Sequence, residues 1–510
     1  MGLDRRGFLQ GTLATASVAA AAPATPATTR RRATEALPTP ADLCYADAGD
    51  LLRLLAAKKL SARELMAAHL ARIAQANPKV NAIVAKLADD ECLALAAQVD
   101  DARMRGAPLG PLAGLPWAFK DLEDAVGFPC TEGSPIYRDE RPATDTLLVE
   151  RLRRAGVVPI GKTNVPEFGM GSHTYNRVYG PTFNPYDPTK SAGGSSGGAG
   201  VALATGMLPL ADGSDLGGSL RNPGNFNNVV GFRPSVGLVP LAPESMPFIG
   251  FTCKGPLGRS VADVALAMSV MSGPDARAPA CLPSTPALFL GPLAREVKGT
   301  RVAWCPDLGG LPLEAEVRHV LESQRATLEG LGCVVEEAAP DLAHADEIFL
   351  TLRRWQTWTW LGPLLAAHRA DVKPEAIAEA EAGSRITAAD LAAAFKAHAE
   401  LLERQRRFHE RYDVIACAVN QVAPFDAALD WPKSVAGAPM THYIEWMRSA
   451  YLITTTWQPA ISVPAGFTPA GLPVGLQLVG RRLEDRRLLE FAHAFEQATR
   501  VGLRRPPTLA

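Results

Sequence analysis

Residues 190–221, K-S-A-G-G-S-S-G-G-A-G-V-A-L-A-T-G-M-L-P-L-A-D-G-S-D-L-G-G-S-L-R, decide how this chain folds. Two glycine–serine clusters flank the apolar run 201–210, which has to be buried, so the stretch does not behave as a flexible linker. Glycine tolerates positive φ and lets backbone N–H groups point at a ligand. We therefore predict two tight loops held by a helix and a strand. Serine hydroxyls would meet converging N–H groups there, as acyl-transfer catalysis requires.

Around this stretch, short apolar segments alternate with amphipathic ones. The strand-like segments include the later part of 111–121, which begins as a turn and has Lys120 at the end of its strand, and also 157–161, 300–305, 414–418, 460–463 and 474–479. The helical segments include 48–77, 85–105, 146–155, 261–271, 314–331 and 483–498, and residues 341–412 are mostly helical in pattern. Strands that alternate with helices predict an α/β fold.

The bulk composition excludes several classes of protein. The chain has 510 residues, 47% of them hydrophobic, and a formal net charge of −1. A near-neutral charge gives no electrostatic reason to expect nucleic acid as a partner. No apolar stretch reaches the roughly 20 residues that a membrane span needs, so we expect no stable membrane insertion.

The N-terminus has a different character from the rest of the chain. Arg5 and Arg6 precede Gly7-Phe8-Leu9, and a weakly apolar run of small residues follows. A basic region, a short apolar region and an A-x-A-like end are typical of a removable export signal. The paired arginines resemble the twin-arginine class, so we predict an export signal and leader over residues 1–35 and a periplasmic location. The alternative is a simple alanine-rich tail.

The eight cysteines are scattered and form no C-x-x-C motif. Zinc sites need closer spacing, so we do not expect zinc. We predict no metal and no cofactor for this chain. Scattered cysteines of this kind are usually buried as small hydrophobic residues. The alternative is one or two disulfides, which form in an oxidising compartment.

Two motif matches are misleading. The segment from Gly156 to Thr163 fits the P-loop pattern G-x-x-x-x-G-K-T, but its middle residues look like a strand rather than a phosphate-binding loop. Ser195 and Ser196 each fit G-x-S-x-G, which would suggest an esterase of the α/β-hydrolase type. No H-G-G-G element lies upstream to support that alternative.

Six segments together resemble the amidase signature family, from about residue 41 to the C-terminus. They are G-L-P-W-A-F-K-D (114–121), G-K-T-N-V-P-E-F-G (161–169), G-G-S-S-G-G (193–198), G-S-D-L-G-G-S-L-R (213–221), V-G-F-R-P-S-V-G (230–237) and G-L-P-V-G-L-Q-L-V-G (471–480). The resemblance implies a large mixed β-sheet core covered by helices on both faces. It also implies one amidase domain over residues 36–510, with the signature core at about 110–275 and a variable helical substrate region at about 340–450.

The resemblance also implies a catalytic triad. Ser219 matches the nucleophile that forms the acyl-enzyme, Ser195 the bridging serine that follows a cis peptide bond, and Lys120 the base. A serine hydroxyl needs a neighbouring base, and lysine serves only when neutral. Its pKa must therefore fall by about 3, which burial behind the apolar L-P-W-A-F would achieve.

The glycine-rich loop before Ser219 would supply the oxyanion hole. The implied donors are the backbone N–H groups of Leu216, Gly217, Gly218 and Ser219. Asp215 and Arg221 flank this loop and are expected to hold it by a charge-assisted hydrogen bond. Ser196 would either donate within the site or only shape the loop. Position 214 is serine where the family commonly has threonine, which keeps the hydroxyl.

The predicted activity is hydrolysis of a small-molecule amide to a carboxylate and an amine or ammonia. The alternative within the same family is the catalytic subunit of a tRNA-dependent amidotransferase, and the export signal argues against it. Residues 169–179, 355–360 and 425–446 are expected to form the substrate pocket. If the tryptophans at 355, 358 and 360 line that pocket rather than fill the core, an aromatic or aliphatic acyl group is favoured. A homodimer is left open.

Overall fold

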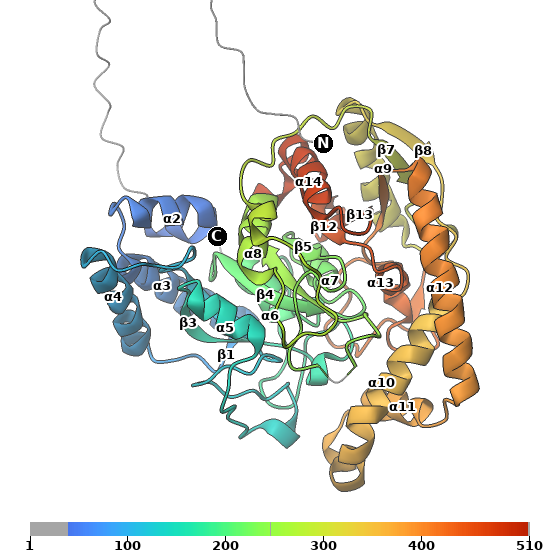
Figure 1. The fold of residues 1–510 in the computed structure, drawn as a ribbon, viewed down its shortest axis with the longest axis horizontal. Coiled ribbons are helices and arrows are strands. Elements are labelled where there is room, and N and C mark those ends of the chain that lie inside the picture. Colours follow the sequence, from blue (N-terminus) through green and yellow to red (C-terminus); the bar gives the residue numbers. More distant parts are fainter. Residues whose placement is uncertain (1–38, 245, 508–510) are drawn as a thin grey trace, which may run out of the picture. The chain divides into compact units, whose positions relative to one another are not determined.

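An eight-stranded mixed sheet forms the centre of the computed structural model, which describes residues 39–244 and 246–507 (Figure 1). Its strands, in order across the sheet, are β4 (Leu210–Asp215), β6 (Cys253–Gly258), β5 (Val230–Arg233), β12 (Ala460–Phe467), β13 (Pro473–Gly480), β9 (Val414–Ala418), β7 (Arg301–Trp304) and β8 (Val334–Glu337). Neighbours from β4 to β9 are antiparallel, whereas β9, β7 and β8 run parallel. The predicted α/β class and mixed sheet are confirmed.

Helices cover both faces of this sheet. Along its central strand β13, apolar and polar side chains alternate, so the two faces pack against different helices. In β13, Leu476 and Leu478 face one way, into a core shared with helices α8 (Val261–Met271), α9 (Ala315–Gly330) and α14 (Asp485–Thr499). Gln477 faces the other way and accepts a hydrogen bond from Arg221, the first residue of helix α7 (Arg221–Phe226). Successive side chains of a strand point to opposite faces, so the two faces receive different helices.

The helices have the following bounds. They are α1 (Pro40–Tyr45), α2 (Ala48–Ala56), α3 (Ala62–Val80), α4 (Asp89–Met104), α5 (Leu147–Arg154), α6 (Gly197–Ala204), α7 (Arg221–Phe226), α8 (Val261–Met271), α9 (Ala315–Gly330), α10 (Ala345–His368), α11 (Pro374–Gly383), α12 (Ala388–Arg411), α13 (Arg448–Thr454) and α14 (Asp485–Thr499). The first predicted helix is in fact two, α2 and α3, and α3 continues past Pro78. Its end is set at Asn81, which adopts a left-handed conformation.

A separate three-stranded sheet carries the lysine that the sequence singled out. It consists of β1 (Ile83–Val84), β3 (Val158–Thr163) and β2 (Pro116–Lys120), and a small hairpin of β10 (Ser434–Val435) and β11 (Ala438–Pro439) lies elsewhere. The Asp212 carboxylate of β4 accepts hydrogen bonds from the Trp117 indole (2.7 Å) and the Lys120 backbone (3.1 Å). These bonds join β2 to the edge of the large sheet. The middle residues 158–160 of the P-loop-like match lie on β3, as predicted, and the strand continues to Thr163, two residues beyond its expected end at Gly161.

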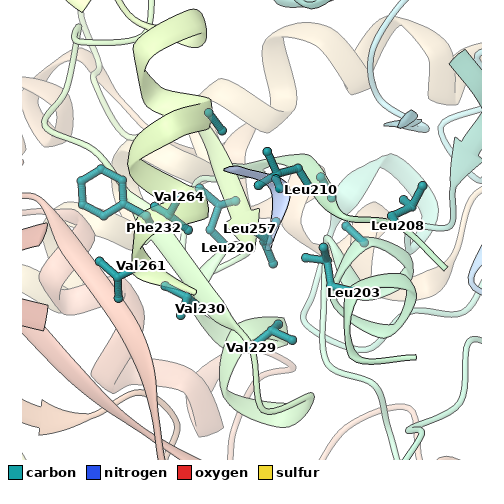
Figure 2. Close-up of a cluster of buried hydrophobic side chains, with 14 of the residues drawn as sticks. Leu203, Leu208, Leu210, Leu220, Val229, Val230, Phe232, Leu257, Val261 and Val264 are labelled. Carbon is teal, nitrogen blue, oxygen red and sulfur yellow. The ribbon is translucent and has the colours of Figure 1, made fainter. Parts of the chain in front are cut away.

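The stretch 190–221 folds into a loop, helix α6, strand β4, a second loop and the start of α7. Every residue of α6 is buried. Leu203 and Leu210 pack with Leu257 of β6 and Val264 of α8, as Figure 2 shows. The predicted helix-and-strand core between the two loops is therefore present.

All eight cysteines are free, and seven of them are buried, as expected for small hydrophobic residues. Within the described ranges, no helix combines the length and the hydrophobicity that crossing a bilayer requires. The export signal predicted for residues 1–35 lies outside the described residues.

Candidate active site

Lys120 ends β2 in a fully buried position among three serine hydroxyls. Its Nζ lies 2.8 Å from Ser195 Oγ, 2.9 Å from Ser196 Oγ and 2.9 Å from Ser214 Oγ. Ser195 and Ser196 belong to the first glycine–serine loop, whereas Ser214 lies on β4. Residues 212 and 214 share one face of that strand, which is why both meet the end of β2.

The environment of Lys120 favours the neutral amine. Burial lowers its pKa to about 7, although the carboxylates of Glu123, Asp212 and Asp215 oppose this shift. Desolvation disfavours the charged form of a group, and here that effect outweighs the nearby negative charges. The direction of this shift is the one that a general base requires. At neutral pH an appreciable fraction of this lysine is an unprotonated base.

Ser195 follows a cis peptide bond with Gly194, as the family resemblance implied. The Ser172 hydroxyl donates a hydrogen bond to the carbonyl of Gly194. Asn222 of α7 donates to Ser172 Oγ (2.6 Å), and Asn420 donates to Asn222 Oδ1 (2.9 Å). A chain of buried polar groups therefore fixes the backbone that presents Ser195.

The loop between β4 and α7 is anchored on the buried carboxylate of Asp215. Arg221 contacts both carboxylate oxygens at 3.0 Å, and Arg233 Nη1 lies 3.3 Å from Oδ1. Burial alone would raise the pKa of Asp215, but the two guanidinium groups hold it well below its usual range. The predicted bond between Asp215 and Arg221 is present, and Arg233 is a second partner that the sequence analysis did not identify. Arg233 does lie in the quoted motif 230–237.

The structure differs from the prediction at Gly218. Its N–H donates to Asp215 Oδ1 at 2.7 Å, and Gly218 does not line the cavity described below. No acceptor among the described residues takes the N–H groups of Leu216, Gly217 or Ser219. These three residues do line the cavity. The loop therefore offers three free donors rather than four, because one is used to hold the loop itself.

A cavity of about 600 Å³ opens onto this loop. Ser195, Ser214 and Ser219 line it, and Ser219 is the most accessible member of the predicted triad, with 7% of its surface exposed against 2% for Ser195 and none for Lys120. The Ser219 hydroxyl makes no hydrogen bond to any described residue. The Ser196 N–H donates to the Ser219 carbonyl at 3.3 Å, which ties the two serine loops together.

The rest of the cavity wall is mostly apolar. It includes Leu122, Tyr137, Phe168, Met170, Phe349, Trp360, Leu364, Ile444 and Met447. Each of the three segments expected to form the pocket contributes to this wall, and of the three tryptophans considered, Trp360 lies on it. No histidine is among the described residues that line it. A Ser–His–Asp site of the α/β-hydrolase type is therefore not formed here.

Ser214, where the family commonly has threonine, was not among the residues predicted to form the site. In the structure it is one of the three hydroxyls around Lys120, and Ser196 is another. The signal for Ser214 in the sequence was its spacing from Asp212. In A-D-G-S-D the two residues are two apart, so on a strand they lie on the same face.

Comparison with known proteins identifies the family of this chain. The Amidase family model matches residues 64–489. An acylamidase of Rhodococcus erythropolis is 34% identical over 469 residues, which cover 90% of this chain and 96% of that protein. A glutamyl-tRNA(Gln) amidotransferase subunit of Synechococcus sp. (strain CC9605) is 35% identical, with 88% and 95% covered.

A solved bacterial aryl acylamidase of the amidase signature family has a similar fold. Its TM-score is 0.83 at 29% identity, with 89% of this chain and 96% of that chain covered. Sequence motifs, fold and matched length all agree, and the chain belongs to the amidase signature family of amide hydrolases.

Proposed function

We propose that the chain hydrolyses acyl amides through an acyl-enzyme on Ser219, with Ser195 and Lys120 as the proton relay. The observation that carries this proposal is the buried amine of Lys120, whose pKa is lowered to about 7 and which lies 2.8 Å from Ser195 Oγ. A lysine kept neutral near working pH is suited to general-base chemistry. A structural lysine would instead be charged and paired with a carboxylate.

In the first step, Lys120 accepts a proton from Ser195 while Ser195 accepts one from Ser219. The Ser219 oxygen then attacks the amide carbonyl carbon. Ser195 next donates a proton to the leaving nitrogen and regains one from Lys120 as the C–N bond breaks. Water repeats the attack on the acyl-enzyme and releases the carboxylate. The proton count is unchanged over each half-reaction.

The tetrahedral intermediates carry a negative oxygen, which the free N–H groups of Leu216, Gly217 and Ser219 are placed to bind. One donor of this kind is typically worth about 3 kcal/mol of transition-state stabilisation. Asp215 and Gly218 support the site indirectly, by fixing the conformation of the loop.

The cavity favours substrates with an apolar or aromatic body. Tyr137, Phe168 and Trp360 lie next to one another on its wall, with ring centroids 6.2 Å apart for Tyr137 and Phe168 and 5.2 Å for Phe168 and Trp360. Pockets lined in this way bind flat or aliphatic groups. The similarity to an aryl acylamidase supports the same substrate class.

Two measurements on the purified chain test this proposal. The first is hydrolysis of a panel of acyl anilides and aliphatic amides, with Ser219→Ala expected to abolish turnover on all of them. The second is labelling with a serine-directed phosphonate, followed by peptide mass spectrometry. The label should be on Ser219, and a label on Ser195 or Ser196 would contradict the assignment.

The similarity to amidotransferase subunits supports a second candidate, a catalytic subunit that acts within a tRNA-dependent complex. That alternative predicts little hydrolysis by the isolated chain. The N-terminal sequence favours the first candidate, since we further propose that residues 1–35 direct export to the periplasm. Fusion of this segment to a reporter that is active only outside the cytoplasm tests the location, with Arg5→Lys/Arg6→Lys as the control.

A further inference from the structure

Glu132 supplies the one carboxylate among the described residues that line the active-site cavity. It is partly exposed, and no hydrogen-bond donor of the described residues reaches its side chain. The one cation on the same wall, Arg353, is already bound, because its guanidinium donates to Glu379 and to the Tyr443 hydroxyl. An acidic group without a partner therefore faces a pocket that is otherwise mainly apolar.

Glu132 lies beside the aromatic part of the wall. Burial and the charge of the Glu132 carboxylate raise the pKa of Tyr137, so the carboxylate lies near that ring. The backbone N–H of Phe168 donates to the backbone carbonyl of Glu132 at 2.7 Å, and Phe168 packs edge-on against both Tyr137 and Trp360. Aromatic faces attract cations, and a desolvated position strengthens that attraction. A carboxylate beside such rings is the usual chemistry for binding an ammonium group.

The backbone at this point supports a role beyond folding. Glu132 has φ of 49° and Phe168 has φ of 56°, both in the left-handed region that side chains other than glycine seldom adopt. Strained conformations of this kind gather at ligand-binding positions, where the surrounding structure holds them. The two strained residues are joined to each other by the hydrogen bond described above.

The charges around Glu132 are net negative. Asp121 and Asp124 lie near enough to raise its pKa, and burial is the larger cause of a pKa of about 7. Lys162 opposes them, but it is held against Asp121 at 3.7 Å and donates to the carbonyl of Glu123. A bound cation would relieve this accumulation of negative charge and keep Glu132 ionised.

We propose that Glu132, with the rings of Tyr137, Phe168 and Trp360, binds a positively charged group of the substrate. The preferred substrates are then amides with an apolar or aromatic body that bears an ammonium group. This inference rests on the proposed hydrolysis of acyl amides and specifies its substrate class.

Two pairs of isosteric substrates test the inference, because a trimethylammonium group has the size and shape of a tert-butyl group. On the acyl side the pair is the anilide of trimethylammonioacetic acid and that of 3,3-dimethylbutanoic acid. On the amine side it is 4-(trimethylammonio)acetanilide and 4-tert-butylacetanilide. For each pair, kcat/KM is measured with the unaltered chain, with Glu132→Gln and with Glu140→Gln. Glu140 is an exposed glutamate of the same segment, so its variant is the matched control.

In at least one pair, Glu132→Gln should lower the ratio of kcat/KM for the cationic over the neutral substrate by about tenfold or more. Glu140→Gln should leave the ratio unchanged. Intrinsic reactivity cancels, since each ratio is compared between enzymes. An unchanged ratio in both pairs would overturn the inference, whereas failure to hydrolyse any of the four would overturn the proposed function as well.

The pH dependence adds a readout that a merely structural glutamate would not move. Both cations are quaternary and keep their charge, so the ratio for the unaltered chain should rise from pH 6 to pH 8 as Glu132 ionises. The titration of Lys120 affects both substrates equally. The groups that act on Glu132 are Asp121, Asp124 and Lys162, and all three are retained in Glu132→Gln, for which the ratio should be flat. A ratio that still rises in that variant would assign the effect to another group.

Discussion

Replacing Lys120 with methionine should remove activity and, at neutral pH, stabilise the fold. The lysine is fully buried, and its pKa of about 7 lies about 3.5 below the ordinary value of 10.5. One pKa unit corresponds to about 1.4 kcal/mol, so burying the charged form costs about 5 kcal/mol. Methionine has nearly the same length and carries no charge.

The gain in stability depends on pH in a defined direction. Because the pKa is lower in the folded state, the unfolded chain binds more protons between pH 7 and pH 10.5, and stability rises with pH over that range. The full penalty is present below pH 7 and disappears above pH 10.5. Loss of the contacts with Ser195, Ser196 and Ser214 offsets part of the gain, at about 1–3 kcal/mol. We expect Lys120→Met to be more stable by about 2–4 kcal/mol at pH 6–7. At pH 9.5 the penalty has fallen to about 1.4 kcal/mol, so the variant should be no more stable than the unaltered chain.

The catalytic effect should be opposite in sign. The neutral amine is the active form, so kcat/KM of the unaltered chain should rise with pH to a plateau, with an apparent pKa near 7 and about a tenth of the plateau value at pH 6. In Lys120→Met the rate should fall by about 10⁴-fold, and the rise with pH should be lost. Kinetics on an acyl anilide and denaturant unfolding at the two pH values provide the measurements.

Lys162→Met is the matched control. Lys162 is also fully buried at the end of the neighbouring strand, but it lies 3.7 Å from Asp121, so its removal leaves a carboxylate unpaired. This variant should be less stable than the unaltered chain. The reasoning is refuted if Lys120→Met unfolds more readily at pH 6, or if it keeps more than about a hundredth of the activity.

Three further changes test the loop that carries Ser219. Asp215→Asn leaves two buried guanidinium groups without their counter-charge and should cost about 3–5 kcal/mol in denaturant unfolding; a cost below 1 kcal/mol would contradict this account. In Gly218→Ala, the alanine would have to adopt φ of 120°, and its Cβ would lie 2.6 Å from the Cβ of Ala450. We therefore expect kcat to fall at least tenfold, while the free energy of unfolding changes less. Ser214→Ala removes one of the hydroxyls around Lys120 and should lower kcat about tenfold, while Ser214→Thr should retain most activity.

The sequence by itself determined the local elements and the family. The pattern at 261–271 predicted helix α8 and the pattern at 414–418 predicted strand β9, both at the bounds observed. Periodicity sufficed there because each element buries an apolar run whose length is limited by flanking polar or turn residues. The low pKa of Lys120 was also predictable, since five apolar residues precede it and the last four of them lie with it on a strand that is buried throughout.

The tertiary structure decided which groups meet. The sequence predicted four equivalent N–H donors before Ser219, but the Asp215 carboxylate takes the one from Gly218, and this depends on where Arg221 and Arg233 hold that carboxylate. Glu132 likewise lies in none of the recognised motifs. Its position in the cavity wall is visible only because the fold brings residues 132, 168 and 360 together there. Local patterns specify what a segment buries, whereas hydrogen-bond partners and cavity walls come from segments far apart in the chain and exist only once these are packed together.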